Sequence, residues 1–487
     1  MDMAKHGKKI RDHLWGPTGS IILHIFIVIL LINLIIPEKR EPDDEAQPII
    51  DRSDSLPAFT PRPDVEPLPP EDNPPMTPDL PPIVKELPPE APNIRDINPT
   101  PVNMPYTSPI KVPVVTSGGP RTSKKARDDA LDKFSDGLGK YTEPAVIRAL
   151  EWLKKHQVKT GERKGAWQPG AKNSSEEQYA AVTGLGLLAF LAHGETLGSE
   201  EYGDTVKMAI KYLQKGQNEH GPDGAFCKLN QQGVYAHAIA SYAISEAFAL
   251  TRVPDLKDVM ENAVRLIVDG QQQGGGWDYG YAKSARRDTS VASWQVQALK
   301  AAYLAGCDVE GVKEAINKSA IDLKKSYLKD SHTFSYTDGE PHSGTTAMAV
   351  LCLQMIGHGK DDVVFEALRE MDDEECSWQT NEKWAMYKWY YLTQAKFHAR
   401  GRRWERWNRD FVKAYVGNQA KDGHWDPPVK GKGHGDAAFG KAFPTALGAL
   451  TLQVYYRFLP SYRGDATKKI EVKSDLDGDE EIDINVI

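Results

Sequence analysis

The sequence predicts an all-α protein whose main domain is an α/α toroid of six helical hairpins, preceded by one transmembrane helix and a disordered proline-rich linker. Three observations carry this prediction: an apolar run near the N-terminus, a stretch that holds most of the prolines, and a helical pattern that recurs six times. The predicted parts are a cytoplasmic N-terminus, the transmembrane helix, a spacer, the toroid and an acidic tail, over residues 1–14, 15–36, 37–139, 140–462 and 463–487.

Length and charge narrow the classes of function. The chain has 487 residues and a net charge of −8, so a nucleic-acid partner has no electrostatic support. Its four cysteines lie far apart and lack the spacing of a metal site, which indicates small buried residues and leaves one or two disulfides open. We expect neither a metal nor a cofactor.

The predicted transmembrane helix decides the compartment. The run from Gly19 to Ile36 has no formally charged side chain, and extended back to Leu14 it is just long enough to cross a bilayer. Basic residues precede it and a net acidic flank follows, which favours a cytoplasmic N-terminus. Because no small-residue cleavage site ends the run, we predict an uncleaved signal-anchor in the inner (cell) membrane. Most of the chain is then periplasmic or extracytoplasmic.

The spacer follows from its prolines. Residues 37–120 hold 23 of the chain's 33 prolines, and each proline removes a backbone donor and fixes φ. Such a stretch cannot form the interior of a helix or sheet, so we predict an extended, partly polyproline-II segment.

The toroid is predicted from repetition. Between residues 140 and 462, a helix with a polar stripe, a turn and a more apolar helix recur six times. The turns carry successive aromatic residues: Trp167, Phe226, Trp277, Phe334, Trp378 and Trp425. The second helices are apolar nearly all round and suit an inner ring, whereas the striped first helices suit an outer ring. Repetition at this period is typical of repeat architectures, and six such hairpins would close into a toroid.

A glutamine that closes the first helix, followed by Gly-x-Trp, resembles the QW repeats of squalene cyclases. The matches are Gln157 with Gly165 and Trp167, Gln271 with Gly275 and Trp277, Gln419 with Gly423 and Trp425, and more loosely Gln217 with Gly224 and Phe226. The resemblance extends to the β-subunits of protein prenyltransferases. It implies the toroid fold, in which the glutamine and the aromatic ring tie neighbouring helices together, but these elements carry no chemistry.

The catalytic motifs of both families are incomplete. Class II terpene cyclases protonate an alkene with an Asp-x-Asp-Asp motif, of which only Asp288 remains here, directly after Arg286 and Arg287. Prenyltransferases hold zinc with an Asp-x-Cys pair and a later histidine, and the matching position here is Ser290. Whether the protein is an enzyme therefore stays open.

Two acids are candidates for catalysis. Other α/α toroids cleave polysaccharides with paired carboxyl groups, and Asp278 and Asp288 both flank the third turn. The alternative is that Asp288 caps the inner helix that begins there.

The beginnings of the inner helices should ring one mouth of the toroid. The candidates for ligand contact there are Tyr279, His237, Asp288, Tyr387 and Trp389. Aromatic walls with a few polar groups suit a lipid chain or a sugar face, although the same rings could seal the core.

Two C-terminal segments have simpler interpretations. The loop "DGHWDPPVKGKGHGD" (residues 422–436) is the nearest approach to a metal cluster, yet its composition favours a solvated loop. The tail alternates apolar and polar residues around Asp477-Gly478, which predicts a small β-hairpin.

The transmembrane run itself carries a further motif. Ser20 and His24 are four residues apart and share a helix face, as in a helix that packs against another membrane helix. This pair, the basic start and the acidic proline-rich spacer resemble the N-terminal half of TonB-type energy transducers. The resemblance implies contact with an ExbB/ExbD-type proton channel, and the alternative is a plain anchor.

Together these features predict a membrane-anchored envelope protein whose toroid is a binding or energy-transduction module linked to a proton channel. The alternative is an enzyme that acts on an isoprenoid or a polysaccharide in the cavity of the toroid.

Overall fold

The computed structural model describes residues 124–171, 173–220, 224–284, 286–337, 339–429, 435–463, 470–473 and 481–484. The predicted anchor, with Ser20 and His24, and the proline-rich stretch lie outside these residues. Within the described ranges, no helix has both the length and the apolar character to span a bilayer.

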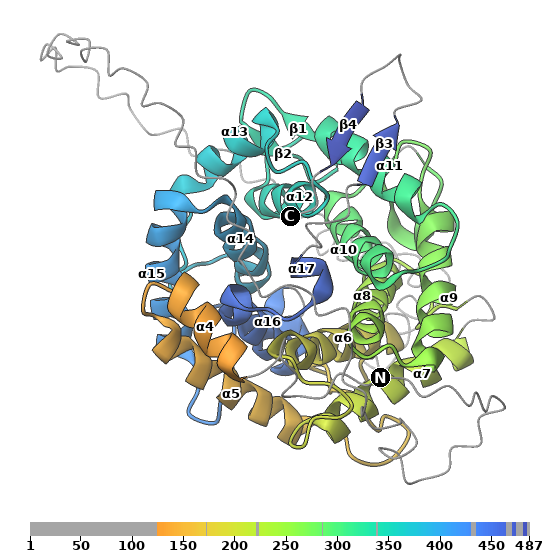
Figure 1. Cartoon of the computed structure of the whole chain (residues 1–487), viewed down its shortest axis with the longest axis vertical. Helices are drawn as coiled ribbons and strands as arrows, with labels where there is room; N and C mark the ends of the chain where they lie inside the picture. The colour runs from red at the N-terminus through yellow and green to blue at the C-terminus, as the bar shows by residue number, and fades with distance from the viewer. Residues whose placement is uncertain are drawn as a thin grey trace, which may run out of the picture. The chain divides into compact units, whose positions relative to one another are not determined.

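Twelve helices of the described chain form two concentric rings (Figure 1). The outer helices are α5 (Gly139–His156), α7 (Gly203–His220), α9 (Pro254–Gly270), α11 (Val312–Lys325), α13 (Asp362–Glu370) and α15 (Gly401–Asn418). The inner helices are α6 (Glu176–His193), α8 (Gly233–Thr251), α10 (Thr289–Ala305), α12 (Ser343–Met355), α14 (Ala385–Ala399) and α16 (Ala442–Leu452). Each inner helix packs against the next, and α16 packs against α6, which closes the ring. The all-α toroid of six hairpins is confirmed.

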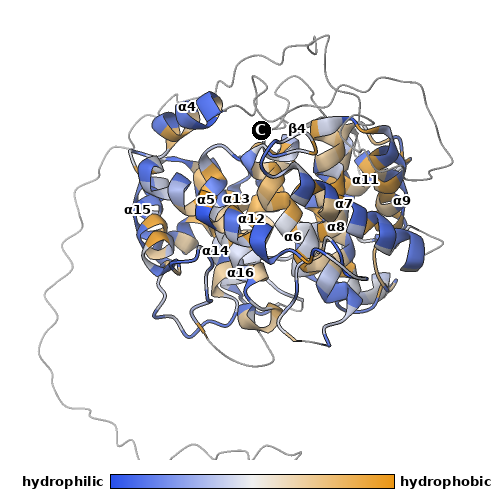
Figure 2. Ribbon diagram, turned by 90° about the horizontal axis from the view of Figure 1, so that it is seen from below, coloured by the Kyte–Doolittle hydropathy of each residue, from blue (hydrophilic) through white to orange (hydrophobic). Residues whose placement is uncertain are grey.

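The burial of the two rings follows the sequence pattern. Inner helices such as α6 and α8 are buried over almost their whole length, whereas an outer helix such as α9 buries one stripe. Figure 2 shows hydrophobic residues over α8 and α12, and a mixture of hydrophobic and hydrophilic positions on α9 and α15. Local signals fix the ends of the inner helix α6: Ser175 forms a capping box with Gln178, and Gly194 ends the helix in the left-handed conformation.

The glutamines of the repeats tie adjacent hairpins together. The Gln157 amide donates to the carbonyl of Gly165 in its own turn (3.0 Å) and to that of Thr205 in the next outer helix (2.9 Å). The other three glutamines do the same, and they reach Val259, Ala315 and Ala145. The last of these bonds, from Gln419 at the end of α15 to Ala145 in α5, joins the sixth hairpin to the first.

The tryptophans of the repeats bind within their own hairpins. Their indole N–H groups donate to carbonyls of the preceding outer helix, at 2.7 Å for Trp167 to Leu153 and 2.9 Å for Trp277 to Ile267. Both indole rings are fully buried. These are the structural roles that the resemblance to QW repeats implies.

The toroid domain begins earlier than predicted. Helix α4 (Lys124–Phe134) lies in the stretch that is predicted as spacer from its composition. It buries Ala130, Leu131 and Phe134 against the core, because its apolar residues recur at helical spacing even though the preceding residues are rich in proline.

The last inner helix ends earlier than predicted. The apolar pattern predicts a last inner helix that runs on to Leu459, but α16 ends at Leu452 and a 3-10 turn, η4 (Gln453–Tyr455), follows. The chain then crosses the inner ring to the short helix α17 (Pro460–Arg463), which lies inside the ring beside α8 and α10 (Figure 1). We call residues 453–461 the plug.

Buried polar contacts hold the plug. The Gln453 amide donates to the carbonyl of Ala189, and the Arg457 guanidinium donates to Gln394 and to the last turns of helix α16. Glu246 accepts hydrogen bonds from Ser461. Burial raises the pKa of Glu246 to about 8, and burial lowers the pKa of the nearby Lys300 to about 7.

The remaining elements are short. Strands β1 (Tyr327–Leu328) and β2 (Thr333–Phe334) form an antiparallel pair in the fourth turn, and β3 (Ile470–Lys473) pairs antiparallel with β4 (Glu481–Ile484), as the tail pattern predicts. The other 3-10 turns of the described residues are η1 (Tyr279–Tyr281), η2 (Met371–Asp373) and η3 (Asp436–Phe439). All four cysteines are free thiols, and three of them are buried.

Candidate functional site

The inner helices all begin at the same end of the ring, because each follows an outer helix through a turn at that end. The third hairpin brings a polar cluster to this mouth. Arg286 bridges the two candidate acids: its guanidinium contacts the Asp278 carboxylate and lies 3.2 Å from Asp288 Oδ2. The same guanidinium stacks over the ring of Tyr279, 4.5 Å from the ring centroid.

Asp288 caps the inner helix α10. Its Oδ1 accepts hydrogen bonds from the backbone N–H groups of Ser290 (3.0 Å) and Val291 (3.1 Å), and from the Ser290 hydroxyl (2.7 Å). The residue has no exposed surface. The capping alternative therefore describes its geometry, and its carboxylate has no oxygen free for a reacting group.

Tyrosines from successive hairpins surround Asp288. The hydroxyl of Tyr235 in α8 shares a hydrogen bond of 2.7 Å with the hydroxyl of Ser290. The hydroxyls of Tyr279 and Tyr336 share another hydrogen bond of 2.7 Å. Tyr387 in α14 accepts from the indole N–H of Trp294. All of these tyrosines are partly exposed.

Burial raises the pKa of Tyr235, Tyr336 and Tyr387, and the Asp288 carboxylate raises each further. These three hydroxyls therefore stay protonated at neutral pH and keep a proton to donate. We call Tyr235, Tyr279, Arg286, Asp288, Tyr336 and Tyr387 the mouth cluster.

A second group of rings lies next to Tyr387. Trp384 and Phe443 pack against it, and Phe439 bridges them. Beneath these rings Asp436 caps α14, with Oδ2 accepting from the N–H of Met386 at 2.8 Å. Its Oδ1 has no hydrogen-bond partner among the described residues, and burial raises the pKa of the carboxyl to about 8.

Two of the predicted ligand contacts lie elsewhere. His237 is fully buried: its Nδ1 accepts from the N–H of Phe226, and its Nε2 lies 3.0 Å from the Ala263 carbonyl. Burial lowers the pKa of this imidazole to about 4, so it is neutral and has no ring nitrogen for a ligand. Trp389 packs on Trp378 and donates to the Glu375 carbonyl at 3.2 Å, within the core between hairpins. Neither residue belongs to the mouth cluster.

Four residues that the sequence predicts for the site, Asp278, Tyr279, Asp288 and Tyr387, come together in the structure. Tyr336 and Asp436 also belong to this mouth but are absent from the predicted set. The "TFSY" turn already marks the position of Tyr336, whereas Asp436 stands in a glycine- and lysine-rich loop that gives no signal of burial.

In the described part of the chain, no group of three or more His, Cys, Asp or Glu side chains could hold an ion. Of the loop candidates, His434 lies outside the described residues. His424 lies between Asp422 and Asp426 and is buried.

Comparisons with known proteins address the fold. No family model and no curated protein matches the sequence. Among solved structures, an inactive variant of an α-1,6-mannanase of Salegentibacter sp. HEL1_6, in complex with α-1,6-mannotetrose, is similar with a TM-score of 0.50 and 11% identity, over 65% of this chain and 99% of that chain. A variant of the type II terpene cyclase MstE from Scytonema, with its substrate geranylgeranyl dihydroxybenzoate, gives 0.45 at 12% identity, over 66% and 99%.

The fold and the first of these likenesses define the chain as an α/α-toroid protein. At such low identity they establish the architecture alone and leave the chemistry to the residues of the mouth. The resemblance of the N-terminal part to energy transducers finds no support in these comparisons and stays a prediction.

Proposed function

We propose that the toroid is a glycan-binding module, displayed outside the membrane by the N-terminal anchor and spacer. The observation that carries this proposal is the mouth cluster, in which partly exposed tyrosine rings from successive hairpins surround a fixed Arg286–Asp288 pair. Aromatic faces stack on sugar rings, while guanidinium and phenol groups hydrogen-bond to sugar hydroxyls. The buried Asp288 carboxylate holds the guanidinium in place.

Two observations favour a glycan over an isoprenoid. A long hydrocarbon substrate would need the interior of the inner ring, and the plug and its buried contacts occupy that interior (Figure 1). The similar mannanase structure holds an oligosaccharide on a toroid fold, which makes a sugar ligand compatible with this architecture.

The environment of Asp278 and Asp288 favours a binding protein over a glycoside hydrolase. Glycoside hydrolysis needs one carboxyl group that protonates the leaving oxygen and a second that assists the attack. Here Arg286 lies between Asp278 and Asp288, and Ser284, Ser290 and backbone N–H groups fill the remaining positions around their oxygens. The pair is therefore built to hold a guanidinium in place.

Replacement of Tyr279 tests this function. On an oligosaccharide array that includes α-1,6-mannotetrose, the full chain in neutral detergent should bind at least one glycan. Tyr279→Ala should lower that affinity about tenfold, because a stacked ring contributes about 1.4 kcal/mol, whereas Tyr279→Phe keeps the ring and should stay within about threefold. Asp288→Asn should also weaken binding, while asparagine still caps α10.

The matched control is Tyr141→Ala, because Tyr141 is an exposed tyrosine on the outer helix α5. It should bind as the wild type does. The proposal fails if no glycan binds, or if Tyr279→Ala binds normally. Release of new reducing ends from the bound glycan would support the hydrolase alternative instead.

A second proposal concerns the N-terminal part and rests on the Ser20 and His24 motif. We infer that this helix face contacts an ExbB/ExbD-type proton channel, so that the toroid is coupled to the energised membrane. An imidazole titrates near pH 6.5 in water, and a helix interface that admits water could use it as a switch.

His24→Leu tests the coupling. The variant should insert in the membrane at the wild-type level, because leucine is more apolar, but it should no longer co-purify with the channel proteins. The matched control is Asn33→Leu, which removes a polar side chain from near the opposite face of the same predicted helix and should still co-purify. Co-purification of His24→Leu at the wild-type level would show that the contact does not need the histidine.

A further inference from the structure

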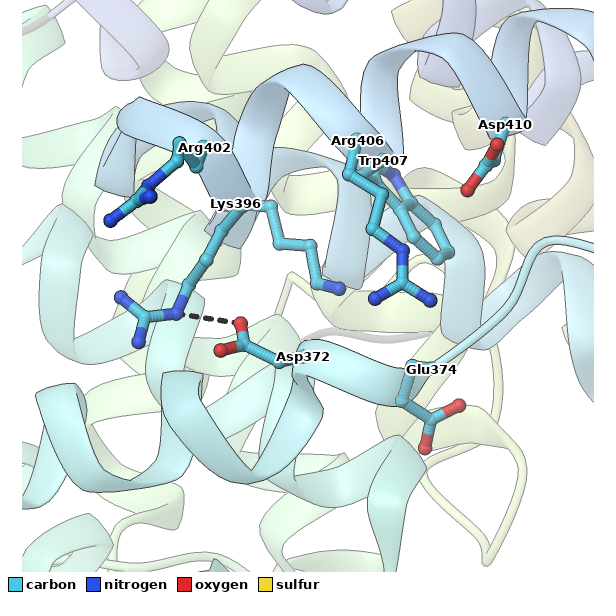
Figure 3. A pocket seen from close by; sticks show the side chains of 8 residues that line it. Asp372, Glu374, Lys396, Arg402, Arg406, Trp407 and Asp410 are labelled. Atoms are coloured by element: carbon cyan, nitrogen blue, oxygen red, sulfur yellow. Dashed lines mark ion pairs between the residues drawn. The ribbon is translucent and has the colours of Figure 1, made fainter. Parts of the chain in front are cut away.

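A pocket of about 200 Å³ lies at the outer ring, away from the mouth cluster (Figure 3). Helix α15 forms one wall, the C-terminal part of α14 forms the floor, and η2 with the residue that follows it forms the other wall. Its lining combines four cations, three acids and one indole: Lys396, Arg402, Arg403, Arg406, Asp372, Glu374, Asp410 and Trp407. The proposed glycan site uses none of these residues.

Lys396 is the unusual member of this lining. The residue is 2% exposed, and its amino group lies 4.7 Å from the centroid of the Trp407 ring. Within the described chain, no carboxylate lies within ion-pair distance of this amino group and no hydrogen bond to it is found. Figure 3 shows its amino group and the Arg406 guanidinium pointing into the same space. A buried ammonium group aimed into a cavity without a partner calls for an anion.

The acids of the pocket do not supply that anion. Asp372 is paired with Arg403 at 2.6 Å, and Glu374 shares Lys388, outside the pocket, with Glu382, at 2.7 and 2.6 Å. Arg406 approaches only Asp373 among the described acids, at 3.7 Å, and the side chain of Asp373 is 98% exposed, so solvent screens that pair.

The lining of the pocket carries one more cation than acid. In the described part of the chain, no acid lies within ion-pair distance of Arg402, and Asp410 is the only lining acid without a cationic partner. Lys396 and Arg406 point into the same space, whereas Arg402 lies at one edge of the pocket and Asp410 at the other (Figure 3).

We propose that this pocket binds a phosphate-class oxyanion, with Lys396 and Arg406 as its hydrogen-bond donors and with Arg402 adding positive charge at the edge of the pocket. Guanidinium groups match the tetrahedral oxyanion with paired N–H donors, and Lys396 adds a point charge from the floor. The source is either a soluble phosphate ester or the headgroup of an anionic phospholipid. The two share this chemistry and differ only in what the phosphate carries.

Calorimetric titration of the full chain in neutral detergent tests the site, with sodium sulfate and inorganic phosphate as probes. Saturable binding is expected, and Arg402→Gln with Arg406→Gln should lower the affinity at least about tenfold, since one charge-assisted contact and a second nearby positive charge are lost. Both side chains are exposed, so the melting temperature should not change. Asp410→Asn should tighten binding, because it removes the unpaired acid.

The matched control is Arg409→Gln, which removes an exposed arginine from the same helix but outside the pocket. Its affinity should equal that of the wild type. Short-chain phosphatidylglycerol, with phosphatidylcholine as its zwitterionic control, separates the two sources. Tighter binding of phosphatidylglycerol than of inorganic phosphate identifies a lipid headgroup, and the reverse order identifies a soluble phosphate.

The pH dependence supplies an independent readout. Burial lowers the pKa of Lys396 to about 8. Asp372 and Glu374 raise this pKa, and Arg406 and Arg403 lower it by a smaller amount. Only the protonated amine holds an anion, so sulfate affinity should fall as the pH rises through about 8. A bound anion favours the charged form, which moves this midpoint upward. Lys396→Met keeps the aliphatic contact with Trp407 and should abolish the dependence.

Two results would overturn the proposal: no saturable binding of either anion, or equal affinities in the wild type and in Arg402→Gln with Arg406→Gln. Either result would mean that Lys396 only packs over the Trp407 ring.

Discussion

Gly423→Ala should open the toroid at the joint between its last and first hairpins and lower the free energy of unfolding by about 3 kcal/mol. Gly423 has a φ of +102°, and a Cβ atom there would lie 2.2 Å from the backbone oxygen of Arg148 in α5. Real Cβ atoms do not approach a carbonyl so closely, so α5 must move away. That movement breaks the bond from Gln419 to Ala145.

Gly417→Ala is the matched control, because Gly417 also belongs to the sixth hairpin, near the end of α15. A Cβ atom at this position would have no neighbour within 4 Å, and the residue has no positive φ, so alanine should be neutral or stabilise by about 0.5 kcal/mol. Urea unfolding of both variants, followed by circular dichroism, measures the difference. Equal midpoints for Gly423→Ala and wild type would show that the closed joint adds nothing to stability.

Trp277→Ala should lower the free energy of unfolding by about 3–5 kcal/mol. The indole is fully buried, and its N–H donates to the Ile267 carbonyl at 2.9 Å. Alanine leaves a cavity and an unpaired carbonyl. Trp277→Phe retains much of the volume and should lose about 1–2 kcal/mol, mostly for the missing hydrogen bond.

Phe365→Ala provides the comparison for an aromatic residue outside the core, since Phe365 is 49% exposed on α13. It should change the free energy of unfolding by less than about 0.5 kcal/mol. Circular dichroism is the suitable probe, because loss of a tryptophan alters the fluorescence signal itself. A cost for Trp277→Ala no larger than that for Phe365→Ala would contradict a role for the indole in holding the hairpin.

The fold could be predicted from the sequence because each repeat carries its own local signals. Gln271, Gly275 and Trp277 stand at fixed offsets, and their bonds run to backbone carbonyls, whose presence does not depend on the side chains of the partner helix. The plug could not be predicted in this way. The segment "QVYYRFL" continues the helical pattern, and its departure at Gln453 depends on contacts with α6, α8 and α14 that no local pattern encodes.

The candidate sites show the same contrast between local sequence signals and contacts that form only in the folded chain. Asp278, Tyr279 and Asp288 could be placed at one mouth because they flank one turn. The prediction places His237 at the mouth, whereas in the structure its ring is buried and bonds to Phe226 and Ala263. A histidine in an apolar helix looks the same in the sequence in either environment. The pocket around Lys396 draws on three separate elements, so no short stretch of sequence could have indicated it.

The hydrogen bond from Gln419 to Ala145 has a consequence for how the domain unfolds. In an open solenoid, terminal repeats have a neighbour on one side only, so they fray and the array can peel from its ends. Here the sixth hairpin is the neighbour of the first, and every hairpin is flanked on both sides. The sixth and first hairpins are joined by non-covalent contacts alone, yet neither of them is an end repeat. The six hairpins therefore constitute one cooperative unit, in which no part is positioned to unravel before the others.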